Sequence, residues 1–164
     1  DAAVDWRPLD GLNLSAGLSY FDYDGWLVHQ EGRNMTTFVG EGLEPYLTLE
    51  YFLSAKQQFK LSVQWVGIEA REQGFYKIPA LPGRLMPVVK PDGSEDSFAI
   101  SDLVFQARYR WEIAPLSDLF IVYVKASDIA RPLGQDNYSD LLDRAWAEPI
   151  ADQLVMKLRY RFGS

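Results

Sequence analysis

The sequence predicts an all-β fold, and within that class the C-terminal six or seven strands of a larger antiparallel transmembrane β-barrel. Three observations lead to this prediction. Several segments alternate apolar and polar side chains with the period of two that a strand requires. Most of them run for about ten residues, the length of a tilted strand that crosses a bilayer. The connections alternate between short and long, as in barrels with short periplasmic turns and long outer loops.

Six segments carry this alternation, and a seventh is indicated only by its end. They are predicted at residues 12–20, 46–53, 58–65, 103–111, 118–126 and 153–162, after the end of an earlier strand at 2–6. The segment at 118–126 is apolar on both faces, so its outward side stays unassigned. In the last segment, one face is Leu154, Met156, Leu158, Tyr160 and Phe162, and the other is Gln153, Val155, Lys157, Arg159 and Arg161.

The connections are predicted from turn residues and from the gaps between strands. Short turns are expected at 7–11, 54–57 and 114–118, where Pro8 and Pro115 pre-set the backbone for a turn. Long loops are expected at 22–44, 71–97 and 127–151, and the second holds Pro79, Pro82, Pro87 and Pro91. Because loops of this length are uncommon inside compact domains, they favour an outer-membrane barrel.

Composition excludes several classes of protein. The chain has 164 residues and a net charge of −7, which argues against a nucleic-acid binder. It has no cysteine, so it has neither a disulfide framework nor a thiolate metal site. No apolar run reaches the length of a spanning helix, and the mean hydropathy is −0.17. Since the first residue is Asp1, residues 1–164 are expected to be part of one barrel domain whose N-terminal strands and any upstream domain are missing.

The residue types for catalysis or metal binding are sparse. His29 is the only histidine, so a zinc site or a histidine-based nucleophile is not expected. Glu50, Glu69 and Glu72 are candidates for paired-carboxylate hydrolysis, but Glu50 is expected to pair with Lys60 across a hairpin instead. The cluster DGSED at 92–96 lacks the spacing of a calcium loop. We therefore predict no catalytic residue, no cofactor, no metal and no enzymatic activity.

Basic residues are the most conspicuous candidates for a functional surface. Arg108, Arg110, Lys157, Arg159 and Arg161 are predicted to line the lumen, because a charge facing lipid at the midplane would cost about 2–4 kcal/mol. There they would either attract anions, bind an internal plug, or neutralise lumen acids such as Glu50 and Glu112. A second set of candidates is aromatic, and it would stack on sugars or build interfacial belts and loop cores: Tyr46, Phe75, Tyr76, Tyr138 and Trp146.

Three stretches carry a resemblance to a known family. FQARYRWEIAPLSDLFIVY, ADQLVMKLRYRFGS and VDWRPLDGL resemble the C-terminal end of a bacterial outer-membrane family, in which a large barrel follows a domain similar to family-nine carbohydrate-binding modules. The resemblance implies a location in the outer membrane of a Gram-negative bacterium, contact with its lipid, and association with carbohydrate. Tyr160 and Phe162 also resemble the terminal signal read by the barrel assembly machinery. Gly163, Ser164 and Lys157 depart from that signal.

The resulting functional prediction is an outer-membrane barrel segment, non-enzymatic in itself and associated with carbohydrate binding or uptake. Three alternatives stay open. The first is the C-terminal part of a TonB-dependent transporter, which would carry an upstream plug domain. The second is a soluble β-sheet binding protein. The third is a glycoside hydrolase that uses Glu50, Glu69 and Glu72.

Overall fold

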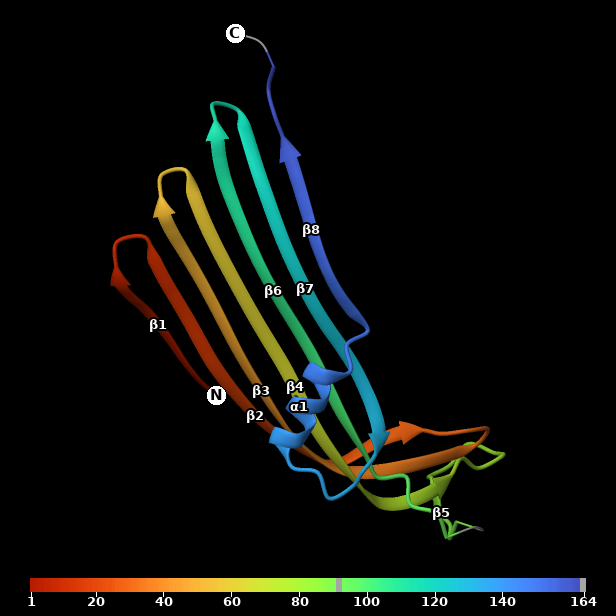
Figure 1. Cartoon of the computed structure of the whole chain (residues 1–164). Coiled ribbons are helices and arrows are strands. Elements are labelled where there is room, and N and C mark those ends of the chain that lie inside the picture. The colour runs from red at the N-terminus through yellow and green to blue at the C-terminus, as the bar shows by residue number, and fades with distance from the viewer. Residues whose placement is uncertain (91–92, 163–164) are drawn as a thin grey trace.

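The computed structural model describes residues 1–90 and 93–162, and it consists of one antiparallel sheet with a single helix against it (Figure 1). The sheet has eight strands in the order β1-β2-β3-β4-β6-β7-β8, with the short β5 paired to β4. The strands are β1 (Ala2–Leu9), β2 (Leu12–His29), β3 (Asn34–Ser54), β4 (Gln57–Lys77), β5 (Met86–Pro87), β6 (Phe98–Ala114), β7 (Ser117–Pro132) and β8 (Ala151–Arg159). The helix α1 is Tyr138–Ala147. The all-β antiparallel prediction is confirmed.

The predicted strands are all found, but most are longer than the alternation indicated. β2, β3 and β4 have 18, 21 and 21 residues, because each continues well beyond its predicted segment. The predicted long loop at 22–44 is wrong: that stretch is the outer part of the β2–β3 hairpin, and only residues 30–33 lie between the two strands. The predicted loop at 127–151 is largely regular structure as well, since it holds the end of β7 and α1.

The three short turns lie at one end of the sheet, which we call the short-turn end (Figure 1). Gly11 adopts a φ of +83° at the first turn, and Leu116 adopts a φ of +60° directly after Pro115 at the third. Pro8 does not form the first turn as predicted, because it still belongs to β1, where the pairing with β2 shifts register between Trp6 and Leu9.

The sheet is open. β1 and β8 form its two edges, and each pairs with a neighbour on one side only. Across the described ranges, no helix combines the length and the apolar character needed to cross a membrane.

The strand register separates the side chains into two faces of opposite character. One complete row of register partners is Trp6, Leu14, Leu49, Leu61, Ala107, Tyr123 and Leu154, and the next is Leu12, Tyr51, Phe59, Tyr109, Ile121 and Met156. We call this side the apolar face. Many of its side chains are exposed, including Leu154 at 67%. The opposite side, which carries Asn13, Glu50 and Lys60, is the polar face.

The helix α1 lies on the apolar face, toward the end of the sheet that is remote from the short turns (Figure 1). Asn137 caps it by accepting hydrogen bonds from the backbone N–H groups of Ser139 and Asp140. Leu141 and Ala145 are buried against Trp65 and Leu103 of the apolar face. This contact forms the hydrophobic core of the molecule.

A hydrogen-bond chain fixes α1 in place. The indole Nε1 of Trp65 donates to Ser101 Oγ over 2.9 Å, and this hydroxyl donates to the carbonyl oxygen of Leu141 over 2.8 Å. Both side chains are buried, so the chain satisfies polar groups that would otherwise lack water. At the other end of α1, the Lys125 ammonium lies 5.0 Å from the centre of the Trp146 ring.

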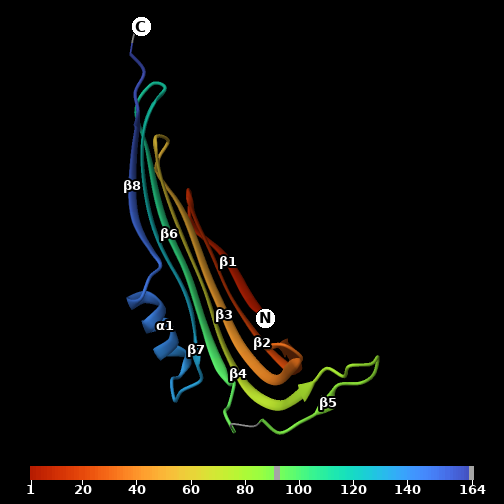
Figure 2. The ribbon, with the colours of Figure 1, turned by 90° about the vertical axis from the view of Figure 1, so that its right-hand side faces the viewer.

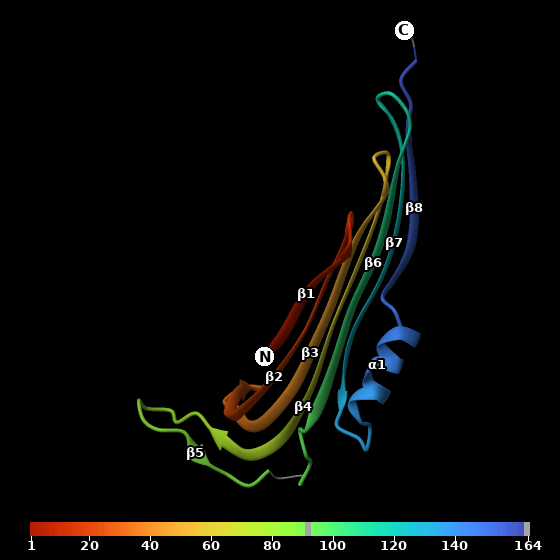
Figure 3. The ribbon, with the colours of Figure 1, turned by 90° about the vertical axis from the view of Figure 1, so that its left-hand side faces the viewer.

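The polar face is covered only at the end remote from the short turns. In Figures 2 and 3 the sheet is seen edge-on, with α1 on one side and β5 with its loop on the other, and the ends of β3 and β4 curve toward the β5 side. Phe38, which is fully buried, packs edge-on against Phe98 at 5.1 Å and near Trp26. The middle of the polar face stays open.

Candidate functional site: a groove on the polar face

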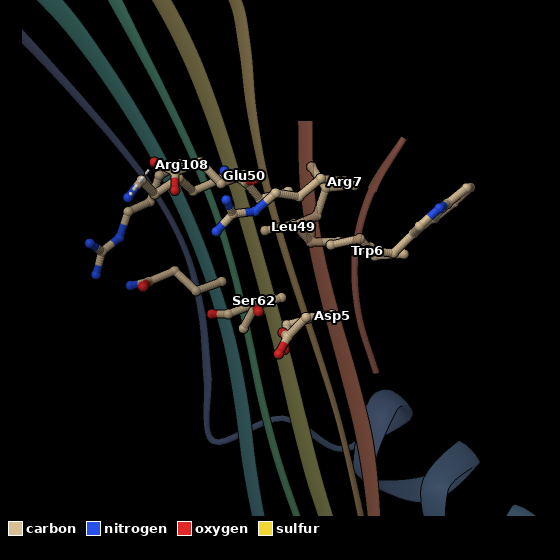
Figure 4. Close-up of a pocket in the computed structure, with 14 residues that line it drawn as sticks. Asp5, Trp6, Arg7, Leu49, Glu50, Ser62 and Arg108 are labelled. Carbon is tan, nitrogen blue, oxygen red and sulfur yellow. Dashed lines mark ion pairs between the residues drawn. The ribbon is translucent and has the colours of Figure 1, made fainter. Parts of the chain in front are cut away.

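A groove of about 790 Å³ crosses the polar face near the short-turn end (Figure 4). Trp6 points away from it, whereas Arg7 extends over it (Figure 4). The polar residues that line the groove come from five strands and are Asp5, Arg7, Asn13, Ser15, Thr48, Glu50, Lys60, Ser62, Gln106 and Arg108.

The register places most of these side chains in two neighbouring rows. The first row is Asn13, Glu50, Lys60 and Arg108, on β2, β3, β4 and β6. Within it, the Lys60 ammonium lies 2.8 Å from Glu50 Oε1, and the same oxygen accepts a short hydrogen bond from Gln58. The predicted Glu50–Lys60 pair across the hairpin is therefore confirmed.

The same row also places two cations side by side. Lys60 and Arg108 are direct partners in the β4–β6 register. Like charges directly opposite on neighbouring strands destabilise a sheet. Lys60 is compensated by Glu50, but neither the Arg108 nor the Arg7 side chain has a hydrogen bond or ion pair to the described part of the chain. The groove thus holds two guanidinium groups that are available to a ligand.

The second row carries uncharged hydrogen-bonding groups. Ser15, Thr48, Ser62 and Gln106 are successive register partners on four adjacent strands. At about 4.8 Å between strands, the row extends about 14 Å across the sheet. Hydroxyl and amide groups in such a line can donate and accept along an elongated polar ligand.

Four of the five predicted basic residues occupy polar-face positions on β6 and β8, and Arg161 follows β8. Their side chains have different partners. Arg108 lines the groove, whereas Arg110 and Arg159 both bind Asp118, whose side chain is only 1% exposed. Neither guanidinium group pairs with Glu50 or Glu112 within the described residues. Lys157 and Arg161 lie outside the groove and have no side-chain partner among the described residues.

A separate ion cluster ties the β5 loop to the sheet. Lys90 is 8% exposed at its side chain, and its ammonium lies 2.5 Å from Glu72 and 2.8 Å from Asp96. Burial by itself lowers the pKa of Lys90, but the hydrogen bonds to Asp96 and Glu72 outweigh it, so the pKa is raised. Lys90 is thus held as a cation, and its ammonium also lies 5.3 Å from the centre of the Phe75 ring.

The predicted candidates for hydrolysis do not come together. Glu50 is on the polar face, whereas Glu69 is on the apolar face. Glu50 lies opposite Lys60, and Glu69 is nine positions farther along β4 than Lys60. At about 3.3 Å per residue this separates them by about 30 Å, too far for a catalytic pair. Glu69 pairs with Arg71, and Glu72 with Lys90.

The other candidates for catalysis or metal binding have local roles. His29 ends β2, and its Nε2 lies 3.0 Å from the carbonyl oxygen of Gly32. In the DGSED cluster, Glu95 accepts from Ser97 and Asp96 binds Lys90, while Asp92 and the neighbouring Pro91 lie outside the described residues. Among residues 1–90 and 93–162, no group of three or more histidine, aspartate or glutamate side chains could hold a metal ion.

The aromatic candidates are scattered. Tyr46 lies within β3, opposite Gly17 of β2, and its ring occupies the space that a side chain at Gly17 would need. Tyr138 and Trp146 belong to α1, on the face opposite the groove. No cluster of these rings lines the groove. Tyr160 and Phe162 lie beyond β8 with their rings 4.9 Å apart, and their role as an assembly signal stays a prediction.

Sequence reasoning missed Arg7 and Asp5 as groove residues. Arg7 was assigned to a turn, and Asp5 to a strand end without a partner. Only the register of β1 against β2 brings both next to the row that contains Glu50 and Lys60. The sequence did contain a signal for them. In VDWRP the charged residues Asp5 and Arg7 alternate with the apolar Val4 and Trp6, which places the two charges on the opposite face of a strand.

Comparison with known proteins identifies the chain by its family. No similar protein is found among curated sequences or among solved structures. A model of the family described as "Domain of unknown function (DUF5916)" matches residues 13–162. This match includes the strands β2 to β8, α1 and most of the groove. The chain therefore belongs to the DUF5916 family.

Proposed function

We propose that this chain forms part of the wall of an outer-membrane β-barrel, with its apolar face toward lipid and its polar face toward a water-filled lumen. In this proposal the chain is non-enzymatic in itself, and the barrel is associated with carbohydrate binding or uptake. The observation that supports it is the separation of the two faces over β1 to β4, β6 and β8, whereas β7 is apolar on both faces. A soluble sheet would have to cover the apolar rows, and most of them carry exposed side chains.

The dimensions of the apolar face also suit a membrane. Its alternating positions from Leu12 to Tyr20 on β2, where Leu18 and Tyr20 are exposed, cover eight residue steps. At about 3.4 Å per residue they extend for about 27 Å, close to the apolar band of about 25 Å in outer-membrane barrels. The long strands are part of the same argument, since β3 and β4 are about four times the usual strand length of five or six residues.

The support for a carbohydrate ligand is the chemistry of the groove. Sugars offer hydroxyl groups that both donate and accept hydrogen bonds. The row of Ser15, Thr48, Ser62 and Gln106 offers matching groups, and the open middle of the polar face leaves them accessible.

Because the sequence has no cysteine, single introduced cysteines can test which face of the sheet contacts lipid. Ala107→Cys and Ser62→Cys place one thiol each on the apolar and polar faces of neighbouring strands. In outer membranes of the native host, a charged maleimide should label Ser62→Cys but not Ala107→Cys. A lipid-soluble quencher should quench bimane on Ala107→Cys only.

The same two cysteine variants also show which results would reject the proposal. Equal labelling of both thiols in the membrane fraction, or recovery of the protein in the soluble fraction, would reject the lipid-facing wall and leave a soluble β-sheet binding protein. Ala107 and Ser62 are both small residues, so the size of the new side chain is not a confounding factor. A separate gel of boiled and unboiled samples should show the heat-dependent mobility of a folded barrel.

A further inference from the structure

The groove on the polar face has more positive charge than its own acids can compensate. Its lining includes three cations, Arg7, Lys60 and Arg108, and two carboxylates, Asp5 and Glu50. Glu50 is already bound to Lys60 and Gln58. A local excess of cations is unexpected in a chain whose net charge is −7.

The position of Arg108 adds to this argument. It is the direct register partner of Lys60, and this adjacency of like charges costs stability unless something negative lies between them. Elsewhere on the same face, guanidinium groups are compensated: Arg110 and Arg159 share Asp118. Among the described residues, the side chains of Arg7 and Arg108 thus stay unpaired in the groove beside Lys60, whereas Lys157 is an isolated unpaired cation outside it.

We propose that the groove is a binding site for a small polar organic anion. The carboxylate, sulfate or phosphate group of the solute lies between Arg7 and Arg108, where planar guanidinium groups can bind it in bidentate fashion. The uncharged body of the solute lies along the hydroxyl and amide row beside them. That this face is a lumen rests on the proposed function, but the site itself is a property of the sheet.

The ligand class follows from how the two rows are combined. A bare inorganic anion would use only the cations and would leave Ser15, Thr48, Ser62 and Gln106 without a role. A neutral sugar would use those groups but would leave Arg7 and Arg108 unpaired in the groove. A solute that has several hydroxyl groups and one oxyanion satisfies both rows, so galacturonate and glucose 6-phosphate are suitable probes.

The test is calorimetric titration of the whole protein, purified from its host in detergent, with galacturonate, glucose 6-phosphate and galactose. At least one of the two acidic sugars should bind about tenfold or more tightly than galactose, since charge-assisted hydrogen bonds are the stronger ones. Equal affinity for all three probes, or binding of none, would overturn the inference.

A matched pair of variants locates the site. Arg108→Gln should weaken binding of the acidic sugar by at least about tenfold. Lys157→Gln removes the same charge from the same face outside the groove, and it should change the affinity by less than about twofold. Equal effects of the two variants would indicate diffuse attraction and reject a specific site. Because neither side chain has a partner in the described fold, neither variant is expected to unfold the protein.

The two proposals can fail separately. If the thiol pair reports lipid on one face but no acidic sugar binds, the barrel wall stands and the anion site is wrong. If an acidic sugar binds with the expected loss in Arg108→Gln but the protein is soluble, the anion site stands and the membrane proposal is wrong.

Discussion

Asp118 and Arg159 lie directly opposite each other in the β7–β8 register, and their side chains form an ion pair. Arg110 of β6 donates to the other oxygen of the same carboxylate from Nε at 3.1 Å and from Nη2 at 3.0 Å. A single buried carboxylate thus joins the last three strands of the sheet at their short-turn end.

We expect Asp118→Asn to destabilise this junction. The variant loses charge-assisted hydrogen bonds to two guanidinium groups, which is worth about 1–3 kcal/mol after allowing for their exposure. The free energy of unfolding from urea titration measures the effect. Asp152→Asn is the control, because Asp152 is 46% exposed and its ion pair with Lys125 lies nearer the surface. An equal loss in both variants would contradict the special role of Asp118.

Tyr138→Phe should leave stability unchanged or raise it. The Tyr138 hydroxyl is buried against α1's docking site and has no hydrogen-bond partner among the described residues. Removing an unsatisfied buried hydroxyl relieves a desolvation penalty of about 1 kcal/mol or more. Thermal unfolding at neutral pH measures the change. A clear loss of stability in the variant would mean that the hydroxyl has a partner in solution.

The same residue predicts a pH dependence. Burial, followed by the charges of Glu41 and Glu69, raises the pKa of Tyr138 to about 12 from an ordinary value near 10. The neutral hydroxyl is favoured in the folded state, so its contribution is complete below pH 10 and is lost as the pH rises toward about 12. The fall in stability across this window should be smaller in Tyr138→Phe than in the parent protein.

Lys90→Met should release the β5 loop from the sheet. The substitution leaves Glu72 and Asp96 as two neighbouring carboxylates without their cation, and removal of one partner from a buried pair costs about 3 kcal/mol. Faster hydrogen exchange in residues 86–90 and 93–97, or faster proteolysis there, would report it. Lys77→Met is the matched control, since Lys77 is exposed on β4 and has no ion pair in the described chain. Equal protection in the two variants would argue against the anchoring role of Lys90.

Gly67→Ala should loosen α1. A methyl group at Gly67 would lie 2.4 Å from the Trp65 ring and 3.1 Å from Tyr138, and Trp65 is held by its buried hydrogen bond to Ser101. Overpacking of this kind costs about 1–3 kcal/mol. Tryptophan fluorescence and urea titration should both change. Gly134→Ala is the control, because a methyl group there meets nothing closer than 3.8 Å, and the two variants should differ clearly in stability.

The alternation of side chains predicted the strands well where one face is apolar and the other polar. Around residues 22–44 it failed, because Phe21 and Trp26 cover the polar-face glycines Gly42 and Gly40 and so remove the contrast between the faces. Such glycines look like loop residues in a sequence, although here they make room for aromatic rings on the neighbouring strand.

The helix and the groove were harder to predict, for a different physical reason. Two buried residues, Leu141 and Ala145, are too few to give α1 a strong pattern of its own, and its stability comes from docking on the sheet. The groove needs the relative register of β1, β2, β3, β4 and β6, which one sequence does not specify. Only the Glu50–Lys60 pair, which lies a few residues from the short turn of a single hairpin, was within reach of the sequence.

The placement of α1 has a consequence for how deep the sheet can sit in a bilayer. The helix lies along the apolar face, with Tyr138 beside Trp65 and Trp146 beside Phe105, so its C-terminal end points toward the uncovered rows. If this face contacts lipid as proposed, α1 limits how deeply the sheet inserts, because the charged residues Asp140 and Asp143 of the helix would have to enter the hydrocarbon region. Trp146, which is 46% exposed, would then mark the level of the headgroups, and depth-dependent quenching of its fluorescence would read that level directly.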